Sequence, residues 1–421
     1  MKKLFVCIAL LICSNHIIAQ EEPENYNMMM ARFKYVYNNS LSDSLYKLYA
    51  PEMKAAVNEE QNKSMITDLH NKFGELKTYS FIKMQGFGIY RMEFSKTITV
   101  MSFTLNSKNK ITGLYFRPYD PSQFLPDSTE RKSNFVCNAS NGKLYGTISC
   151  PEGKKKVPIV VIIAGSGPTD RDGNNNLGIK TYCYKMLADS LLKYHIACLR
   201  YDKRGIGESV SLSKPEDSLR FEDMANDAAD IIAQVKKDGR FSDIYIVGHS
   251  EGSLLGMLTA EKEQVAGYIS LAGIGRPAAT VIKEQIMTSG AKDQTAINSS
   301  LDSLQKGYEV HYIPQGGESL LRKSVQPYMI SWFRFDPSIE IKKLKIPVLI
   351  IQGNTDIQVS IVDANKLHDA KKGSKLVVIN GMNHVLKDAP LDKKKNILTY
   401  SDPVLPIKTE LVSAIRNFVN E

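Results

Sequence analysis

The sequence predicts an α/β fold in which a doubly wound, mostly parallel sheet carries a helical insertion and follows a small α+β domain. Three features of the sequence support this prediction. Apolar runs of strand length alternate with helix-like segments over the C-terminal part of the chain. A stretch of helical pattern interrupts that alternation before its last two strands. The N-terminal part instead places helix-like segments ahead of a group of strands.

The first residues have the pattern of a secretory signal peptide. Two lysines precede an apolar stretch from Leu4 to Ile12, and Ala19 supplies the small residue expected at a cleavage site. We therefore expect residues 1–19 to be removed, with export to the periplasm or the extracellular space and no stable membrane insertion afterwards. An uncleaved anchor is the alternative, but the apolar stretch is short for a bilayer. A lipid signal at Cys13 would need a small residue in place of Ile12.

The composition argues against several classes of function. The 421 residues carry a formal net charge of +9, with charges of both signs interspersed along the chain. No basic cluster has interleaved aromatic residues, so we expect no nucleic-acid partner. The cysteines have no zinc-site spacing, and we expect neither a metal nor an organic cofactor. Cys137 and Cys150 flank a predicted hairpin and can form a disulfide, although small buried thiols fit the pattern equally well.

Residues 25–119 are predicted to form the α+β domain. Apolar residues recur at helical spacing between Met28 and Tyr37, and a hairpin turn at 106–110 joins the last two strand-like segments. The four strand-like segments are 78–83, 88–94, 97–105 and 111–116. The order of elements resembles that of small NTF2-like accessory domains. Its only histidine, His70, is expected at a solvated helix position.

Prolines among polar residues mark a linker at 120–132, and the α/β domain is expected to occupy residues 133–421. A hairpin around Asn141-Gly142 opens this domain. The apolar run 157–164 then predicts a strand buried on both faces, as in a parallel sheet. Further strands are expected at 196–201, 244–247, 267–272, 348–352 and 375–379, and helices at 182–192, 222–235, 253–263, 362–370 and 407–419.

Residues 276–344 form the insertion. Its helices are expected at 278–288, 294–306 and 319–333. An insertion at this point would lie over the carboxyl ends of the strands, where ligands bind in such sheets. We interpret it as a lid, with a second packing layer as the alternative. Trp332, beside Phe333 and Phe335, is placed to line a ligand pocket or to form the core of the insertion itself.

The segment Gly248-His-Ser-Glu-Gly252 joins a strand-like run directly to a helix-like run. A sharp turn between strand and helix presents Ser250 as a nucleophile. The flanking glycines fit this geometry, because a Cβ at either position would press on a neighbouring strand or helix. The pattern also occurs by chance in unrelated chains, so its position between strand and helix supports the interpretation more than the letters do.

A serine nucleophile needs a base and an acid that orients the base, and on this type of turn they follow in the chain order Ser, acid, His. His384 comes on a loop after the predicted strand 375–379, which is where the base belongs. Two other histidines follow Ser250. His311 falls in the insertion, and His368 is expected at a solvated helix position.

Asp356 is the predicted acid. It follows the strand 348–352 through a glycine turn, which delivers it to the same edge of the sheet as the base. Two rival carboxylates are expected to be surface charges. Asp363 lies on the next predicted helix, and Asp388 lies in a lysine-rich loop beyond the histidine.

A developing oxyanion needs preorganised donors, which are usually backbone N–H groups. We predict the amide of Glu251, directly after the nucleophile, as the first donor. The second is expected to be the amide of Ser166 in the turn Ala164-Gly-Ser-Gly-Pro168 after the first buried strand. Glycines in this turn let the backbone approach a substrate.

With these features in order, the chain from about Phe135 resembles the α/β-hydrolase superfamily, and more narrowly the bacterial EstD-type esterases and the serine aminopeptidase group. Besides the nucleophile segment, the motifs that carry the resemblance are Gly165-Ser-Gly-Pro-Thr-Asp-Arg-Asp-Gly173, Arg200-Tyr-Asp-Lys-Arg-Gly-Ile-Gly-Glu-Ser209, Gln352-Gly-Asn-Thr-Asp356 and Gly381-Met-Asn-His384. Asp202 and Arg204 are expected to anchor the loop after their strand. Relatives often carry a histidine where this chain has Ala164.

The resemblance implies the roles of nucleophile, acid and base for Ser250, Asp356 and His384. The sequence therefore predicts an exported serine hydrolase that cleaves small-molecule carboxylic esters through an acyl-enzyme. An amide or peptide hydrolase is the alternative, in which carboxylates of the insertion bind the amine of the substrate; the candidates are Glu284, Asp293, Asp302, Glu309 and Glu318. A non-catalytic ligand-binding protein is a third hypothesis, disfavoured by the complete set of catalytic residue types.

Overall fold

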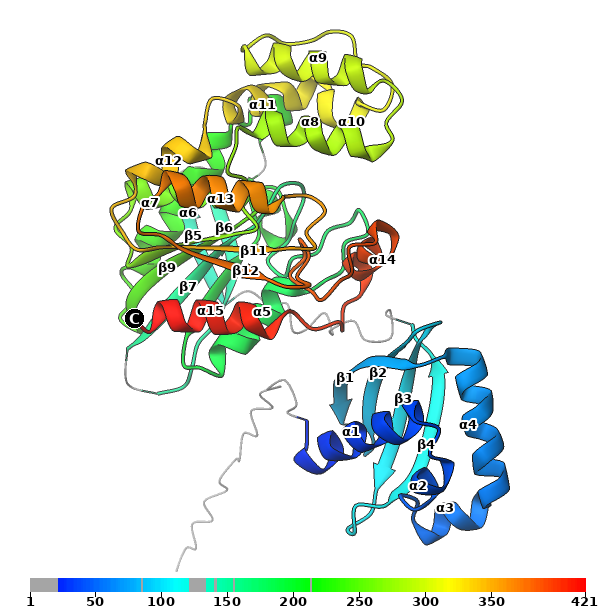
Figure 1. The fold of residues 1–421 in the computed structure, drawn as a ribbon. Coiled ribbons are helices and arrows are strands. Elements are labelled where there is room, and N and C mark those ends of the chain that lie inside the picture. Colours follow the sequence, from blue (N-terminus) through cyan, green and yellow to red (C-terminus); the bar gives the residue numbers. More distant parts are fainter. Residues whose placement is uncertain (1–21, 85, 121–133, 140–141, 154–155, 213) are drawn as a thin grey trace, which may run out of the picture. The chain divides into compact units, whose positions relative to one another are not determined.

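The computed structural model describes residues 22–84, 86–120, 134–139, 142–153, 156–212 and 214–421. The chain divides into two compact units, Met1–Asp120 and Pro121–Glu421 (Figure 1). The predicted signal segment and almost all of the predicted linker lie outside the described residues. In the part of the chain that is described, no helix combines the length and the apolar character needed to cross a bilayer.

The N-terminal unit has helices followed by strands, as the sequence predicts. Its helices are α1 (Glu24–Asn38), α2 (Ser42–Tyr46), α3 (Pro51–Ala56) and α4 (Glu59–Phe73). They are followed by an antiparallel sheet of β1 (Leu76–Met84), β2 (Gly88–Phe94), β3 (Ile98–Leu105) and β4 (Ile111–Pro118), paired in chain order. Aromatic and methionine side chains of α1 pack against one face of the sheet. This arrangement confirms the α+β class of the first unit.

His70 is half-buried and has partners in α1, so the prediction of a solvated position is wrong. Its ring stacks on Tyr37 with 4.2 Å between the centroids, and its Nε2 lies 2.6 Å from the carbonyl oxygen of Tyr37. The position on α4 faces α1, which periodicity within α4 alone does not reveal.

The second unit is built on an eight-stranded sheet in the order β12-β11-β10-β9-β7-β8-β6-β5. Its strands are β5 (Phe135–Ala139), β6 (Gly142–Ser149), β7 (Val157–Ile163), β8 (Ala197–Tyr201), β9 (Phe241–His249), β10 (Gly267–Leu271), β11 (Val348–Gly353) and β12 (Lys375–Ile379). β5 pairs antiparallel with β6, and β6 pairs antiparallel with β8. All the other pairs of neighbouring strands are parallel. This confirms the predicted mostly parallel sheet.

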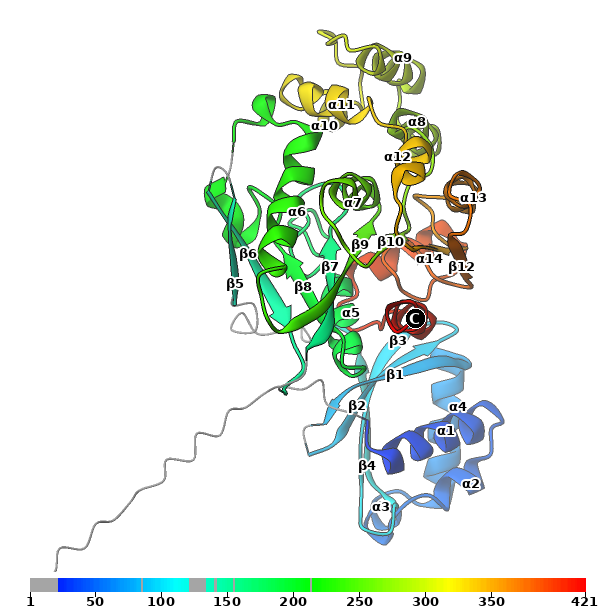
Figure 2. The same ribbon diagram turned by 90° about the vertical axis from the view of Figure 1, so that its left-hand side faces the viewer.

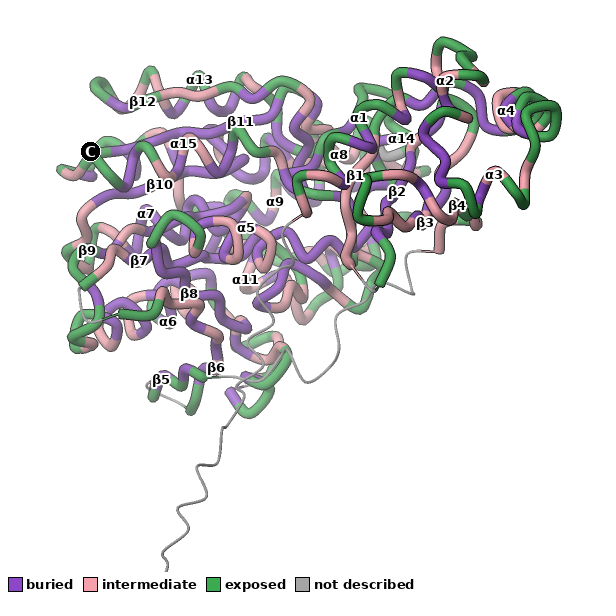
Figure 3. The backbone as a smooth tube through the Cα atoms, turned by 90° about the horizontal axis from the view of Figure 1, so that it is seen from below, coloured by how far each residue is buried: buried purple, intermediate pink, exposed green. Residues whose placement is uncertain are grey.

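Helices cover both faces of this sheet (Figure 2). Side chains of β7 alternate between two cores: Val161 packs with α6 (Phe221–Val235) and α7 (Glu251–Lys262), whereas Val160 packs with α5 (Cys183–Leu192) and α15 (Thr409–Val419). Figure 3 shows the central strands buried along their length. Burial on both faces explains why their sequences are continuously apolar.

The insertion between β10 and β11 contains α8 (Ala278–Ser289), α9 (Gln294–Gln305), α10 (Glu318–Leu321), the 3₁₀ turn η5 (Lys323–Val325), α11 (Gln326–Trp332) and α12 (Pro337–Lys343). The single helix predicted over 319–333 is therefore wrong. Arg322 is extended, with φ −51° and ψ 140°, and Pro327 sits in the first turn of α11. Proline suits a first turn because its missing N–H is not needed there.

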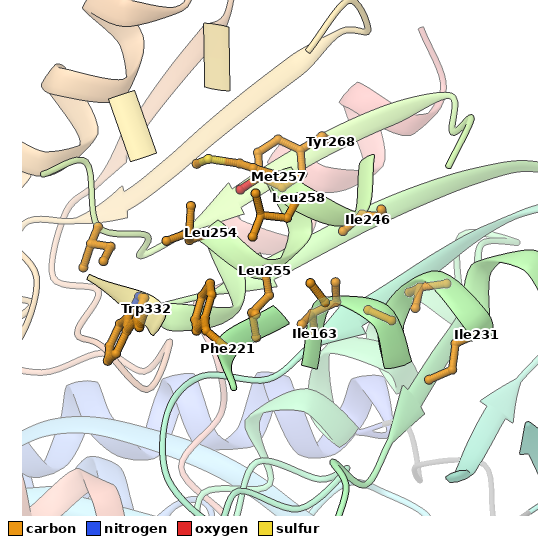
Figure 4. Close-up of a cluster of buried hydrophobic side chains, with 14 of the residues drawn as sticks. Ile163, Phe221, Ile231, Ile246, Leu254, Leu255, Met257, Leu258, Tyr268 and Trp332 are labelled. Carbon is orange, nitrogen blue, oxygen red and sulfur yellow. The ribbon is translucent and has the colours of Figure 1, made fainter. Parts of the chain in front are cut away.

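Trp332 belongs to the core beneath the insertion. Its ring stacks on Phe221 of α6, with centroids 5.6 Å apart and planes 7° apart, and Figure 4 shows the two rings side by side among buried residues of α7. The N–H of Phe221 donates to Ser331 Oγ at 2.8 Å. These contacts attach α11 to α6.

The remaining elements are α13 (Ile361–Ala370), α14 (Lys393–Leu398) and the 3₁₀ turns η3 (Gly207–Leu212), η4 (Glu216–Ser218) and η6 (Thr399–Ser401). The lysine-rich segment around α14 is helical, capped by Asp392, whose Oδ1 accepts from the N–H of Lys395 at 2.9 Å. Cys137 and Cys150 are free thiols, with Cys137 buried and Cys150 half-buried. Among the residues that the structure describes, no group of three metal-ligating side chains comes together.

Candidate active site

Ser250 lies in the turn between β9 and α7. Its φ of 57° and ψ of −122° are strained for a residue with a side chain. A Cβ on Gly248 would lie 2.3 Å from the carbonyl oxygen of Gly252, and a Cβ on Gly252 would lie 2.3 Å from that of Ile163. Both contacts are to backbone, so only glycine fits at either position. The N–H of Ser250 donates to Leu271 of β10 at 2.9 Å, which anchors the turn to the sheet.

The loops after β11 and β12 bring the predicted acid and base to this turn. His384 Nε2 lies 3.1 Å from Ser250 Oγ, and His384 Nδ1 lies 2.8 Å from Asp356 Oδ2. Because a carboxylate only accepts, Nδ1 carries the proton and Nε2 is left as the acceptor for the serine hydroxyl. The three side chains therefore form one hydrogen-bonded chain across three loops.

Asp356 is held as a carboxylate. Its side chain is fully buried, and Oδ1 accepts from the N–H groups of Gln358 at 2.8 Å and Val359 at 3.0 Å. Burial alone would raise the pKa of Asp356, but His384 and these backbone donors outweigh it and lower the pKa. The negative charge therefore stays beside Nδ1 of His384.

The rival residues lie elsewhere. His311 is exposed in the insertion, and Nδ1 of the half-buried His368 lies 2.9 Å from Ser374 Oγ. Asp388 is a surface charge as predicted, 62% exposed and paired with Lys408.

Asp363 is not a surface charge, and that prediction is wrong. Its side chain is fully buried and bridges α13 to the start of the insertion. Its carboxylate accepts from the N–H of Gly275 at 3.0 Å and from Nη2 of Arg276 at 2.8 Å. The partner lies 87 residues away in the sequence, so the helical pattern around Asp363 carries no sign of it.

The two predicted oxyanion donors lie beside the nucleophile. Glu251 is the first residue of α7, where an N–H has no acceptor within the helix. Ser166 follows Gly165, and a Cβ on Gly165 would lie 3.0 Å from Cβ of Ser250. Within the described residues, neither the N–H of Ser166 nor that of Glu251 has an acceptor in the protein. Both donors are therefore available to a substrate oxygen.

His249 forms a second hydrogen-bonded chain that sequence reasoning missed. Its Nε2 lies 2.8 Å from the carbonyl oxygen of His384, and its Nδ1 lies 2.7 Å from the hydroxyl of Tyr184. A carbonyl only accepts, so Nε2 carries the proton and Nδ1 accepts from the hydroxyl, which in turn accepts from the N–H of Gly165 at 3.3 Å. This chain links the base loop to the turn that carries Ser166.

Burial keeps His249 neutral. Burial lowers the pKa of His249 to about 3, and the nearby His384 makes a smaller contribution in the same direction. Its position directly before the nucleophile was visible in the sequence, but Tyr184 is 65 residues away from it. No local signal connects the two.

Buried ion pairs hold the loops behind the site. Asp202 accepts from the N–H of Arg171 at 2.9 Å and from its Nη2 at 2.6 Å, and Arg204 donates twice to Asp227, at 2.7 and 2.5 Å. These contacts agree with the anchoring roles predicted for Asp202 and Arg204.

Comparison with known proteins matches this chain to a peptidase family model and to an esterase. A family model described as serine aminopeptidase, S33, matches residues 177–312. Over 347 residues the chain is 27% identical to esterase EstD of Thermotoga maritima. This match covers 77% of this chain and 79% of EstD. The second unit has the α/β-hydrolase fold. In this α/β-hydrolase the family match includes the nucleophile turn and ends before the acid and base loops.

Solved α/β-hydrolase structures are also similar to this chain. Est1E from Butyrivibrio proteoclasticus, with ferulic acid bound, is 21% identical, with a TM-score of 0.46, and the match covers 68% of this chain and 100% of Est1E. The esterase EaEST from Exiguobacterium antarcticum is 16% identical, with a TM-score of 0.43, and the match covers 68% of this chain and 99% of EaEST. The similarity of residues 25–119 to NTF2-like domains stays a prediction.

Proposed function

We propose that this protein is an exported serine esterase that hydrolyses small-molecule carboxylic esters through an acyl-enzyme on Ser250. The observation that carries the proposal is the hydrogen-bonded chain from Ser250 Oγ through His384 to Asp356, with steps of 3.1 and 2.8 Å. The similarity to esterase EstD supports an ester as the substrate.

The first half of the reaction forms the acyl-enzyme. Ser250 Oγ attacks the ester carbonyl carbon while His384 Nε2 takes the hydroxyl proton, and the N–H groups of Ser166 and Glu251 stabilise the negative charge on the carbonyl oxygen. The bond to the alcohol oxygen then breaks, and His384 returns the proton to the departing alcohol.

The second half releases the acid. Water attacks the acyl carbon, His384 takes one of its protons, and the bond to Ser250 Oγ breaks as the proton passes to the serine. In both halves Asp356 keeps the proton of the neutral imidazole on Nδ1 and stabilises the imidazolium that forms. The residues named here supply the nucleophile, the proton carrier and the charge stabilisation.

An amide or peptide hydrolase is the second candidate, because the matching family model is described as serine aminopeptidase. Such an enzyme needs a free carboxylate to bind the amine of its substrate. Four of the five candidate carboxylates in the insertion are engaged: Glu284 by Arg276, Asp302 by Lys283, Asp293 by the N–H of Gln315, and Glu318 by the N–H of Gly316. The fifth candidate, Glu309, is exposed, and the peptidase hypothesis therefore depends on it.

Hydrolysis of p-nitrophenyl acyl esters by the purified protein tests the proposal. Ser250→Ala is expected to lower kcat by at least about 10⁴-fold, and Ser299→Ala, at an exposed position of α9, is the matched control. If Ser250→Ala keeps the wild-type rate, the nucleophile is wrongly assigned. Aminoacyl p-nitroanilides, measured beside the esters, distinguish the two candidate activities, and faster turnover of the anilides would favour the peptidase.

A fluorophosphonate probe tests the third hypothesis, a non-catalytic binding protein. Wild-type protein is expected to be labelled on Ser250, and absence of any adduct would favour the non-catalytic hypothesis. Export is tested separately by N-terminal sequencing of protein recovered outside the cytoplasm, which is expected to begin at Gln20 after removal of residues 1–19.

A further inference from the structure

Three polar side chains that the proposed reaction does not use lie beside the nucleophile turn. Lys203 follows β8, Glu251 opens α7, and Tyr328 comes from α11 of the insertion. Glu251 is only 4% exposed, and Lys203 and Tyr328 are half-buried. Burying a charged group costs free energy unless the group is paired or hydrogen-bonded. The contacts of these three side chains therefore need a physical explanation.

Lys203 binds the backbone of the turn that carries Ser166. Its Nζ donates to the carbonyl oxygen of Gly165 at 2.5 Å. That carbonyl and the N–H of Ser166 belong to the same peptide group, which is planar and trans, so the two point in opposite directions. Fixing the oxygen of Gly165 therefore fixes the direction of the Ser166 N–H.

The preceding peptide is fixed as well. The N–H of Gly165 donates to the hydroxyl of Tyr184 at 3.3 Å. A glycine has more backbone freedom than any other residue, and the next glycine, Gly167, has a φ of 76°. The turn therefore depends on partners outside it to hold one orientation, and Lys203 supplies the contact on the peptide that matters for the oxyanion.

The side chain of Glu251 carries a charge opposite to that of Lys203 and is bound by the insertion. Burial raises the pKa of the Glu251 carboxyl, and the opposite charge of Lys203 and the hydroxyl of Tyr328 both oppose that rise. Burial likewise lowers the pKa of Lys203, and Glu251 opposes this shift. The hydroxyl of Tyr328 donates to Glu251 Oε1, and the Tyr328 ring packs against Phe221 with centroids 5.9 Å apart.

We propose that Lys203 is a positioning residue that aims the Ser166 amide at the oxyanion, and that the bond from Tyr328 to Glu251 couples the residue carrying the other oxyanion amide to the insertion. The inference rests on the proposed esterase function. Through this contact α11 affects the chemical step without touching the reacting atoms. Glu251 has two roles, since its own amide is the other predicted donor.

The expected effect falls on kcat, because an oxyanion exists only in the transition state and its intermediates. Loss of a whole oxyanion donor costs roughly 10²- to 10³-fold in kcat. Misdirecting a donor that is still present should cost less. We expect Lys203→Met to lower kcat by about 10- to 100-fold, with KM changed by less than about threefold. Tyr328→Phe, which acts one step further away, is expected to lower kcat by about three- to tenfold.

The test uses steady-state hydrolysis of a p-nitrophenyl ester by the full chain. The matched controls are Lys236→Met, a surface lysine paired with Glu263, and Tyr308→Phe, an exposed tyrosine of the insertion. Lys203→Arg keeps a cationic donor and is expected to recover at least about half of the lost activation free energy. A trifluoromethyl ketone, which forms an oxyanion on adding to the serine, is expected to bind more weakly to Lys203→Met by the factor lost in kcat/KM.

Three results would overturn the inference: an unchanged kcat in Lys203→Met, a loss carried by KM alone, or ketone binding that does not weaken. If Lys203→Met does not fold, Tyr328→Phe decides, because removing one hydroxyl keeps the ring against Phe221, and an unchanged kcat there rejects the coupling. Failure of the proposed function looks different, since the wild type would then show no hydrolysis dependent on Ser250.

Discussion

The cores of the two units are built from different side chains. The N-terminal unit packs rings on rings, with Tyr37 stacked on Phe33 at 5.8 Å and Tyr90 on Phe103 at 5.4 Å between centroids. Arg91 is the charged side chain buried in its described residues, and it pairs with the half-exposed Glu93. The α/β-hydrolase unit buries a larger set of charged side chains: Arg171, Asp172, Arg200, Asp202, Arg204, Asp227, Glu251, Glu340, Asp363, Lys387 and Asp402.

The difference reflects what each unit must hold in place. Apolar packing is non-directional and stabilises a fold without fixing the direction of any backbone group. A reacting site needs loops held to a fraction of an ångström, and charge-assisted hydrogen bonds supply that directionality. Several buried charges of the second unit, among them Arg171, Asp202 and Arg204, lie in loops, and Asp202 accepts from the backbone N–H groups of Arg171 and Glu208.

The largest stability effect should come from breaking a buried charge pair in the α/β-hydrolase unit. Arg204→Met leaves Asp227 buried without its bidentate partner and is expected to cost about 3–5 kcal/mol. Arg240→Met removes an arginine from an exposed pair with Asp238 and should cost less than about 1 kcal/mol. Urea unfolding followed by the fluorescence of Trp332, the only tryptophan, measures this unit. Equal costs for the two variants would contradict the contrast between the cores.

A pH-dependent effect of intermediate size should come from His249. Its pKa falls from 6.5 to about 3 in the folded protein, so the unfolded chain binds a proton that the folded chain does not between these values. Above about pH 6.5 His249 is neutral in both states, and below that pH its exclusion of a proton lowers the free energy of unfolding by about 1.4 kcal/mol per pH unit. His249→Gln should show a shallower fall of the unfolding free energy, and His311→Gln is the matched control. A variant slope equal to that of the wild type would show that His249 titrates normally.

The smallest effect is expected in the N-terminal unit. The hydroxyl of Tyr37 donates to the carbonyl oxygen of Gly74 at 2.8 Å, and Tyr37→Phe should cost about 1–2 kcal/mol by leaving that oxygen unpaired. Hydrogen exchange of β1 and β2 peptides reports the change, and Tyr35→Phe, at an exposed position, should show none. Esterase kcat should not change in either variant. A cost as large as that of Arg204→Met would remove the contrast.

Much of the candidate site could be predicted because its residues are tied to the ends of strands. Asp356 and His384 each follow a parallel strand by a few residues, and the carboxyl ends of parallel strands meet at one edge. The nucleophile turn was predictable because backbone sterics require glycine on both sides of Ser250. The pattern of apolar residues predicted the strands of both sheets, because the sequence of each strand reflects which of its two faces are buried.

Side-chain partners far apart in the sequence were not predictable. Asp363 has the helical context of a surface residue, and only Arg276, brought to it by the insertion, makes it a buried anchor. Tyr328 and Glu251 lie 77 residues apart in the sequence, and only the fold brings the hydroxyl of one to the carboxylate of the other. The break in the predicted helix 319–333 has a local sign in Pro327, which lies in the first turn of α11.

The sequence by itself determined the order of strands and helices and the positions of Ser250, Asp356 and His384 after the ends of their strands, because local sterics and burial patterns depend on a few neighbouring residues. The tertiary structure alone decided which charges are buried and which distant side chains they pair with. These properties depend on what packs against a group from elsewhere in the chain. In a low-dielectric interior a single such contact decides whether a polar group is stabilised or left unpaired.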